Sequence, residues 1–114
     1  MCSWKIEYWH PKDQNSSSIE RLFDQLTDEQ FKSVAKEIKL LELCGNTLRL
    51  PHGRAIGKGL FELRERKFGY RIYYVFIKNR VIVLLHAGNK STQKKDIKAA
   101  GLYLQMLKES THEN

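Results

Sequence analysis

The sequence lacks a run of apolar residues long enough to span a membrane, which takes about 18. Its first residues, MCSWKIEYWHP, have no apolar centre of the kind that a secretory signal peptide needs, so we expect a cytoplasmic protein with no membrane partner. The chain has only two cysteines and four histidines, and their spacing fits neither a disulfide framework nor a metal site. We therefore expect free thiols at Cys2 and Cys44, and no metal or other cofactor.

Internal repeats and linkers rich in proline or glycine are also missing. With 114 residues, of which 41% are hydrophobic and 29% are charged, the chain has the length and composition of one globular domain. We place this domain at residues 1–109 and expect residues 110–114 to form a frayed tail. No P-loop, dinucleotide-binding fingerprint or Ser-His-Asp motif is present.

Positive charge is concentrated in one part of the chain. Residues 49–98, the basic segment, hold 13 Lys and Arg against 3 Asp and Glu, whereas residues 1–48 hold 6 against 8. An asymmetry of this kind indicates an electrostatic surface for a polyanion, and RNA is the best candidate. The alternative is a solvated basic face over a core that contains the tyrosines.

The first half of the chain has the pattern of one strand and two helices. Residues 3–9 alternate apolar and polar side chains, as a half-buried strand does. Ser17 and Glu20 have the spacing of a capping box, and so do Thr27 and Gln30, which predicts two helices with a very short turn. Gly45 is placed to end the second helix.

The second half changes to the period of strands. After a polar connector around residues 51–53, we predict strands at 60–66, 70–77 and 81–86, joined by short turns as an antiparallel meander. A last helix begins near Ser91 or Thr92. The order β-α-α-β-β-β-α predicts an α+β domain, with one antiparallel sheet packed against a helical hairpin and a C-terminal helix.

Basic and aromatic side chains alternate within the basic segment. Phosphate oxygens attract cations, arginine can bind them with two hydrogen bonds, and aromatic rings can stack on bases. The residues that we expect at such a site are Arg49, Arg54, Lys58, Arg64, Arg66, Arg71, Lys90, Lys94 and Lys95, with Tyr70, Tyr73 and Tyr74 between them.

Two residues of this segment are candidates for proton transfer. His86 follows an apolar strand and could act as a general acid or base, or its ring could be held by backbone groups at the strand end. Glu62 is one of three acids among many cations and could deprotonate a 2′-hydroxyl, or it could neutralise Arg64 or Arg71. Core packing is the alternative role for Tyr103 on the last helix.

Three motifs between residues 57 and 97 resemble the RelE/ParE toxin superfamily, and most of all its addiction-module killer branch near the HigB toxins. The first is Glu62-Leu63-Arg64, the second is Gly69-Tyr70-Arg71, and the third is GNKSTQ at residues 88–93. Their spacing makes the resemblance more specific than any one motif would be.

The resemblance implies a RelE-like fold and a metal-independent endoribonuclease that cuts messenger RNA on the ribosome. It implies that Arg71 binds the scissile phosphate, that Lys90 stabilises the transition state, and that Arg64 contributes to the site or supports it. It also implies a cognate antitoxin, often a helix-turn-helix protein.

The chain departs from the best-known ribonucleases of this superfamily in two ways. They carry a lysine pair on the strand that holds Leu60 and Glu62 here, and a tyrosine or histidine near the C-terminus with no clear counterpart in this sequence. Two alternatives therefore stay open. One is a ParE-like toxin that inhibits DNA gyrase by binding, and the other is a relative without catalytic activity.

Overall fold

The computed structural model describes residues 3–112, and the side chains up to residue 110. Cys2 and residues 113–114, on which we made predictions, lie outside the described residues. The elements in chain order are β1 (Lys5–Tyr8), α1 (Ser18–Gln25), α2 (Asp28–Cys44), the 3-10 turn η1 (Gly45–Thr47), β2 (Gly53–Gly57), β3 (Leu60–Glu65), β4 (Tyr70–Ile77), β5 (Val81–Asn89), the 3-10 turn η2 (Lys90–Thr92) and α3 (Gln93–His112). Within residues 3–112, no helix is both long and apolar enough to cross a membrane.

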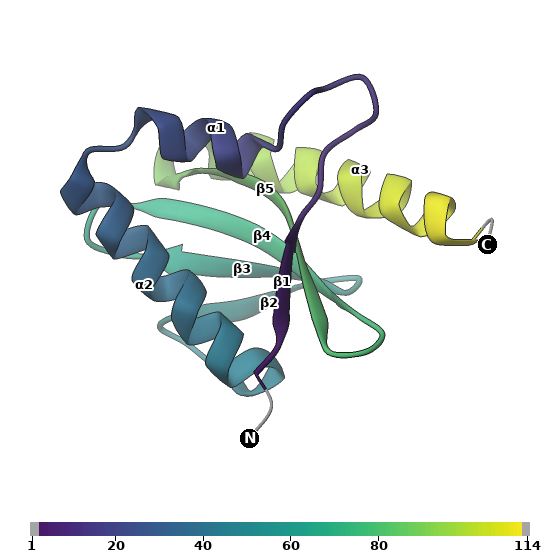
Figure 1. Ribbon diagram of the computed structural model, residues 1–114, viewed down its shortest axis with the longest axis horizontal. Helices are drawn as coiled ribbons and strands as arrows, with labels where there is room; N and C mark the ends of the chain where they lie inside the picture. The colour runs from purple at the N-terminus through teal and green to yellow at the C-terminus, as the bar shows by residue number, and fades with distance from the viewer. Residues whose placement is uncertain (1–2, 113–114) are drawn as a thin grey trace.

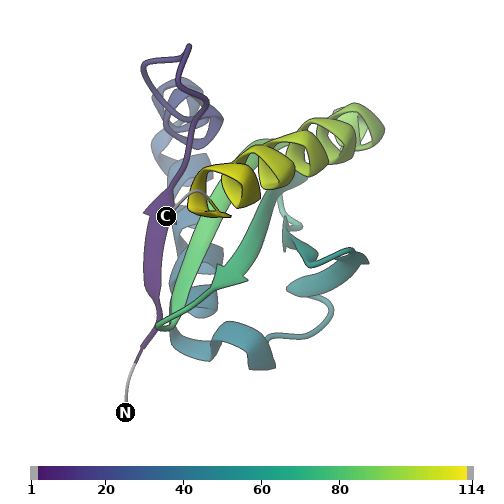
Figure 2. The same cartoon turned by 90° about the vertical axis from the view of Figure 1, so that its right-hand side faces the viewer.

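One five-stranded sheet forms the centre of the molecule, in the order β1-β5-β4-β3-β2 (Figure 1). The four strands β2 to β5 are antiparallel neighbours, while β1 joins the other side of β5 in parallel. Helices α1 and α2 cover one face of the sheet, and α3 crosses the other face, as the two views show together (Figures 1 and 2). The predicted α+β architecture is therefore confirmed.

Local signals in the sequence set the two N-terminal helices. Ser17 and Thr27 each accept a hydrogen bond from the main-chain N–H three residues on, and Glu20 and Gln30 complete the two capping boxes. Helix α2 ends at Gly45, which has a φ of 53°. A Cβ atom there would lie 1.9 Å from Nε1 of Trp4, so the close approach of the indole also requires glycine.

Two predictions about the elements were wrong. Residues 53–57 form an additional strand, β2, although we predicted a connector in this region. Its sequence, GRAIG, lacks the alternation of apolar and polar residues that identifies a strand, because β2 lies at the edge of the sheet. Helix α3 continues to His112, so residues 110–112 belong to a helix instead of the predicted tail.

Each face of the sheet has its own apolar core. The core on the α1/α2 face contains Ile19, Val34, Leu41, Leu63, Ile72, Tyr74, Ile82 and Leu84. The core on the α3 face contains Leu60, Tyr73, Val75, Val83, Leu85, Ala100, Leu104 and Leu107. The second core covers only part of its face, and the rest of that face holds the charged residues described next.

Candidate functional site

Four polar side chains form a row across the α3 face of the sheet. The strand register pairs Arg54 with Glu62, Glu62 with Tyr73, and Tyr73 with His86, so one residue comes from each of β2, β3, β4 and β5. Since alternate residues of a strand face opposite sides, and Tyr73 packs in the core under α3, the whole row faces that helix. We call these four residues the polar row.

Glu62 is the centre of the polar row and is fully buried. Its carboxylate accepts hydrogen bonds from Nε of Arg54 at 2.9 Å, from the hydroxyl of Tyr73 at 3.2 Å and from Nε2 of Gln93 at 2.7 Å. Burial opposes ionisation, but the bonds from Gln93 and Arg54, with the charges of Arg54 and Arg71, outweigh it and lower the pKa of Glu62. Glu62 is therefore held as a carboxylate whose oxygens are already occupied.

Two arginines lie opposite each other in the neighbouring row of the same face. The register pairs Arg64 of β3 with Arg71 of β4, and residues paired in this way have Cβ atoms about 5 Å apart. Arg71 is only 5% exposed, and its Nε and Nη1 are buried without a hydrogen-bond partner among the described residues. The same is true of Nε of Arg64. We call Arg64 and Arg71 the arginine pair.

The arginine pair is costly unless something else binds there. Like charges on directly opposed residues repel, and each buried polar group without a partner costs about 1–3 kcal/mol, more when charged. Glu62 contributes an opposite charge near Arg71 but gives it no hydrogen bond. An anion with several oxygens, such as a phosphate, would satisfy these N–H groups.

His86 ends the polar row and uses both of its ring nitrogens. Nδ1 lies 3.0 Å from Oγ of Ser18, and Nε2 lies 2.9 Å from Oδ1 of Asp96. Because the carboxylate of Asp96 can only accept, Nε2 carries the proton that faces it, and Nδ1 of a neutral imidazole is then left to accept from the hydroxyl of Ser18, whose oxygen accepts the N–H of Ala87. His86 thus connects α1, β5 and α3.

Asp96 is the partner that fixes His86 from the side of α3. It is buried, and its second oxygen accepts a hydrogen bond from the hydroxyl of Thr92. A Cβ atom on Gly88 would lie 1.8 Å from Oδ2 of Asp96, so glycine leaves the space that this carboxylate fills. Gly88 is also paired with Arg71, so this carboxylate lies close to the arginine pair.

Most of the other predicted cations gather at the same end of the sheet. Arg66 lies in the turn between β3 and β4, Lys90 begins η2, and Lys94 and Lys95 lie in the first turn of α3. The main-chain N–H of Lys90 donates to the carbonyl of Gly69 at 2.8 Å, which joins this end of β5 to the start of β4. All four side chains are exposed and therefore accessible to a polyanion.

Several of the predicted site residues do not belong to this group, and two of them, Tyr70 and Tyr74, pack against the core on the α1/α2 face, opposite the arginine pair. Lys58 lies in the turn at the other end of β3, about 20 Å from Arg64 at the rise of an extended strand. Tyr73 is fully buried, so its ring offers no face to a base, and the prediction that it stacks on RNA was wrong. Its hydroxyl donates to Glu62 instead, and burial, together with Glu62, raises the pKa of Tyr73.

Sequence reasoning assigned no role to Gln93 or Asp96. Gln93 donates a hydrogen bond to Glu62, and Asp96 is hydrogen-bonded to His86, although each lies on a different element from its partner. The one sequence signal was their position in and just after the GNKSTQ motif.

Among the described residues, no group of three or more His, Cys, Asp and Glu side chains could hold a metal ion.

Comparison with known proteins assigns the chain to a family. Residues 21–108 match the family described as phage derived protein Gp49-like (DUF891), which covers most of the chain, and the protein belongs to this family. A protein of Haemophilus influenzae described as uncharacterized is 44% identical over 55 residues, which are 47% of this chain and 56% of that protein. The chain thus spans little more than half the length of this relative.

Solved structures place the fold among the RelE toxins. The chain is similar to RelE in the intact E. coli RelBE toxin–antitoxin complex, with a TM-score of 0.54 and 13% identity over 76% of this chain and 96% of that one. It is also similar to the archaeal RelE–RelB complex of Pyrococcus horikoshii, with a TM-score of 0.52 and 16% identity over 77% and 96%. The predicted resemblance to the RelE/ParE superfamily and its fold is confirmed.

Proposed function

We propose that this protein is the toxin of a type II toxin–antitoxin module and that it cuts messenger RNA on the translating ribosome in the cytoplasm. The observation that carries the proposal is Arg71, a nearly buried arginine with two unpartnered N–H groups opposite a second arginine. A phosphodiester supplies the oxygens that the arginine pair lacks. The exposed Arg66, Lys90, Lys94 and Lys95 would hold the flanking phosphates.

The chemistry that suits this site is transfer of the phosphodiester within the RNA strand. The 2′-oxygen attacks the adjacent phosphorus and the bond to the 5′-oxygen breaks, which leaves a cyclic phosphate and a 5′-hydroxyl. The proton of the 2′-hydroxyl is lost, and the departing 5′-oxygen gains one. Arg71 and Arg64 stabilise the negative charge that grows on the phosphate oxygens, and Lys90 adds a third cation at the same end of the sheet.

Arg54 would extend this surface along the polar row. Its Nε is bound to Glu62 at 2.9 Å, while its side chain is 43% exposed. The bond to a buried carboxylate fixes the guanidinium, and its terminal nitrogens, which make no hydrogen bond within residues 3–112, could bind a further phosphate. Glu62 then acts as a positioning residue, because its oxygens are occupied and its pKa is lowered, both of which suit a general base poorly.

An antitoxin is the partner that accompanies this proposal. The structures of E. coli RelE and P. horikoshii RelE named above are complexes with a RelB antitoxin, and this chain has the same fold. A helix-turn-helix protein is the partner that the sequence motifs favour. The antitoxin would silence the toxin until it is removed.

A second candidate is a toxin that inhibits DNA gyrase by binding, as ParE-like proteins do. The observation that favours it is the state of the two proton-transfer candidates. Both ring nitrogens of His86 and both oxygens of Glu62 are already hydrogen-bonded within the chain. A site of this kind binds a polyanion or an acidic protein without cutting it.

Expression of the protein without an antitoxin tests the proposal. We expect the wild type to arrest growth and to create new transcript ends in translating cells. Arg71→Ala removes the central phosphate contact and should lower cleavage by roughly 10²- to 10³-fold. Lys98→Ala, an exposed cation of the same basic segment on α3, is the matched control and should cut as the wild type does.

The outcome also separates the two candidates. Growth arrest without new transcript ends would contradict the nuclease, and inhibition of supercoiling by purified protein in the absence of RNA would then establish the gyrase reading. If the wild type neither arrests growth nor inhibits supercoiling, this relative has no toxic activity of its own.

A further inference from the structure

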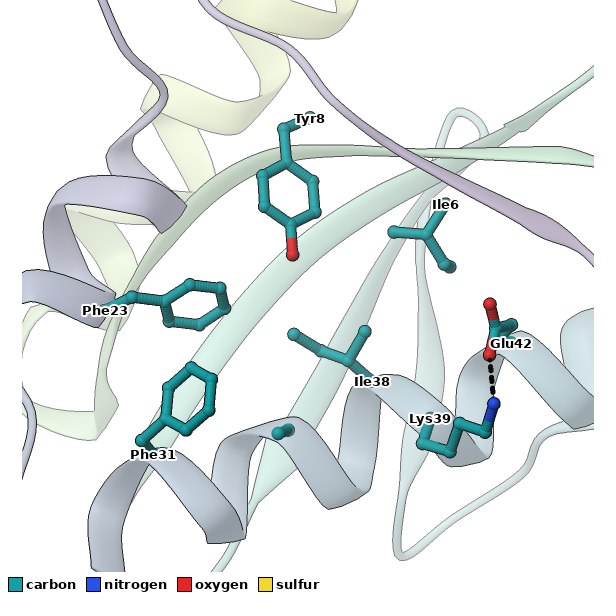
Figure 3. Close-up of a pocket in the computed structure, with 8 residues that line it drawn as sticks. Ile6, Tyr8, Phe23, Phe31, Ile38, Lys39 and Glu42 are labelled. Atoms are coloured by element: carbon teal, nitrogen blue, oxygen red, sulfur yellow. Dashed lines mark hydrogen bonds and ion pairs between the residues drawn. The ribbon is translucent and has the colours of Figure 1, made fainter. Parts of the chain in front are cut away.

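The α1/α2 side of the molecule has an apolar groove that the proposed function does not use (Figure 3). It has a volume of about 380 Å³ and lies between β1 and helices α1 and α2. Its lining consists of Ile6 and Tyr8 from β1, Phe23 from α1, and Phe31, Ala35, Ile38, Lys39 and Glu42 from α2. Tyr8 and Phe31 remain 42% and 43% exposed, which leaves large aromatic surfaces in water.

One side of the groove is the free edge of the sheet. Strand β1 pairs only with β5, and in this parallel register residues 5, 7 and 9 direct their main-chain groups toward β5. The outward-facing amide of Trp4 donates to the carbonyl of Glu42 at 2.9 Å, so α2 closes the edge at that point. The next outward-facing amides, of Ile6 and Tyr8, make no such bond within residues 3–112.

The two features meet in the same two residues. Ile6 and Tyr8 point their side chains into the groove, as Figure 3 shows, and their main-chain N–H and C=O groups lie on the open edge of β1. An added strand could therefore form main-chain hydrogen bonds with β1 and place alternate side chains in the groove. This is the arrangement by which sheet edges bind extended peptides.

The positive charge on the outer side of α2 indicates what kind of segment would bind in the groove. Lys32, Lys36 and Lys39 are exposed and have the spacing of a single row along the helix. Each follows by one residue a groove-lining residue of the same helix, Phe31, Ala35 or Ile38, so the lysine row lies next to the groove. Lys39 pairs with Glu42 at 2.9 Å. An extended segment with carboxylates would complement this row.

We propose that the edge of β1 and the adjoining groove bind an extended acidic segment of a partner protein. The segment adds a sixth strand beside β1, packs apolar side chains against Phe23, Phe31 and Ile38, and directs carboxylates to the lysine row. This site lies on the opposite face of the sheet from the arginine pair. Its existence does not depend on whether the protein cuts RNA.

Selection of peptides from an unbiased random library, displayed on phage and captured by the full-length protein, tests the proposal. We expect the enriched peptides to alternate apolar residues and to carry Asp or Glu. Binding of a selected peptide should protect the amides of Ile6 and Tyr8 from hydrogen exchange, as measured by NMR. The double variant Lys32→Glu with Lys36→Glu should weaken binding roughly tenfold, because it places like charges against the carboxylates.

Lys98→Glu is the control for the double variant, since it changes an exposed lysine on the other face of the sheet. It should leave peptide affinity unchanged, and circular dichroism should show that all variants are folded. The proposal is overturned if no peptide is enriched, if the enriched peptides are basic, or if they bind without protecting the two amides. Protection of these amides in the free protein that rises with protein concentration would also overturn it, because a second copy would then be the occupant.

Discussion

The two faces of the sheet differ in how they use the same strands. On the α1/α2 face, the side chains of β3 and β4 that lie around residues 63 and 72 are apolar and join a closed core. On the α3 face, the next register pair of the same two strands is Arg64 and Arg71. The α1/α2 face is therefore apolar around Leu63 and Ile72, with the buried Glu65 hydrogen-bonded at its rim to Ser33 and to main-chain N–H groups. The α3 face combines its core with a group of buried charges, two of which are the facing arginines.

This difference indicates which face is under functional constraint. Burial of Glu62, Arg71 and Asp96 costs free energy that an apolar core would not cost. Hydrogen bonds repay the cost for Glu62 and Asp96, but for the arginine pair the described residues leave N–H groups unpaired. A departure from efficient packing that the chain itself does not compensate is typical of a site for a ligand.

The largest effect on stability should come from the packing face. Leu84→Ala removes a fully buried side chain from the core between the sheet and helices α1 and α2. We expect the free energy of unfolding to fall by about 4 kcal/mol, which urea denaturation measures. Leu102→Ala is the control, because Leu102 is 57% exposed on α3 and should change stability little. Equal losses in the two variants would contradict the assignment of the core.

The centre of the polar row should come next. Glu62→Ala leaves Arg54, Tyr73 and Gln93 without their common acceptor, and removes an opposite charge that lies near Arg71. We expect a loss of about 3 kcal/mol in urea denaturation. If Glu62 only positions Arg54, the variant that still folds should keep part of its RNA binding. Complete loss of cleavage with unchanged RNA affinity would instead show that the carboxylate takes part in the reaction.

Arg71 should show the opposite balance between stability and function. Arg71→Met replaces a buried cation with an apolar side chain of similar length, so the free energy of unfolding should stay the same or rise by about 1–2 kcal/mol. RNA binding and growth arrest should be lost. Matched urea curves and filter-binding assays measure both quantities. A marked loss of stability would show that Arg71 serves the fold, and the comparison between the faces would fail.

Local signals in the sequence predicted much of the fold. Capping boxes at Ser17 and Thr27 and the apolar pattern of β3 to β5 act over a few residues, so they can be read without coordinates. Strand β2 could not be predicted in this way, because GRAIG becomes a strand only by pairing with β3. The resemblance to known toxins pointed to Arg71 and Arg64, but not to their facing position or to the lack of partners for their N–H groups.

The contacts of Glu62 and His86, the two candidates for proton transfer, could not be predicted from the periodicity of the sequence. Gln93 meets Glu62, and Asp96 meets His86, only because α3 crosses the sheet at one particular place. The same contacts occupy the polar atoms of both candidates for proton transfer, Glu62 and His86. Burial of Tyr73 follows from the same crossing, since its side chain faces α3 instead of solvent.

The smallest expected effect is a dependence of stability on acid, and it separates buried from exposed carboxylates. The pKa of Glu62 is lowered below the ordinary value of 4.5, despite burial, by its bonds to Gln93 and Arg54. A carboxyl with a lowered pKa in the folded state stabilises the fold above its ordinary pKa, and this contribution disappears as the pH falls through the lowered value. Glu62→Gln should therefore flatten the loss of stability in acid, measured by urea denaturation at a series of pH values.

Glu29, an exposed carboxylate, is the control for the buried Glu62. Its pKa is also lowered, by a hydrogen bond and the charge of Lys67, but it lies on the surface, where salt screens the pair. At high salt, Glu29→Gln should follow the acid dependence of the wild type, whereas Glu62→Gln should still differ from it. If the two variants behave alike, the carboxylate of Glu62 is accessible to water and ions. The α3 face would then be an ordinary charged surface, without the buried polar row that distinguishes it from the face covered by α1 and α2.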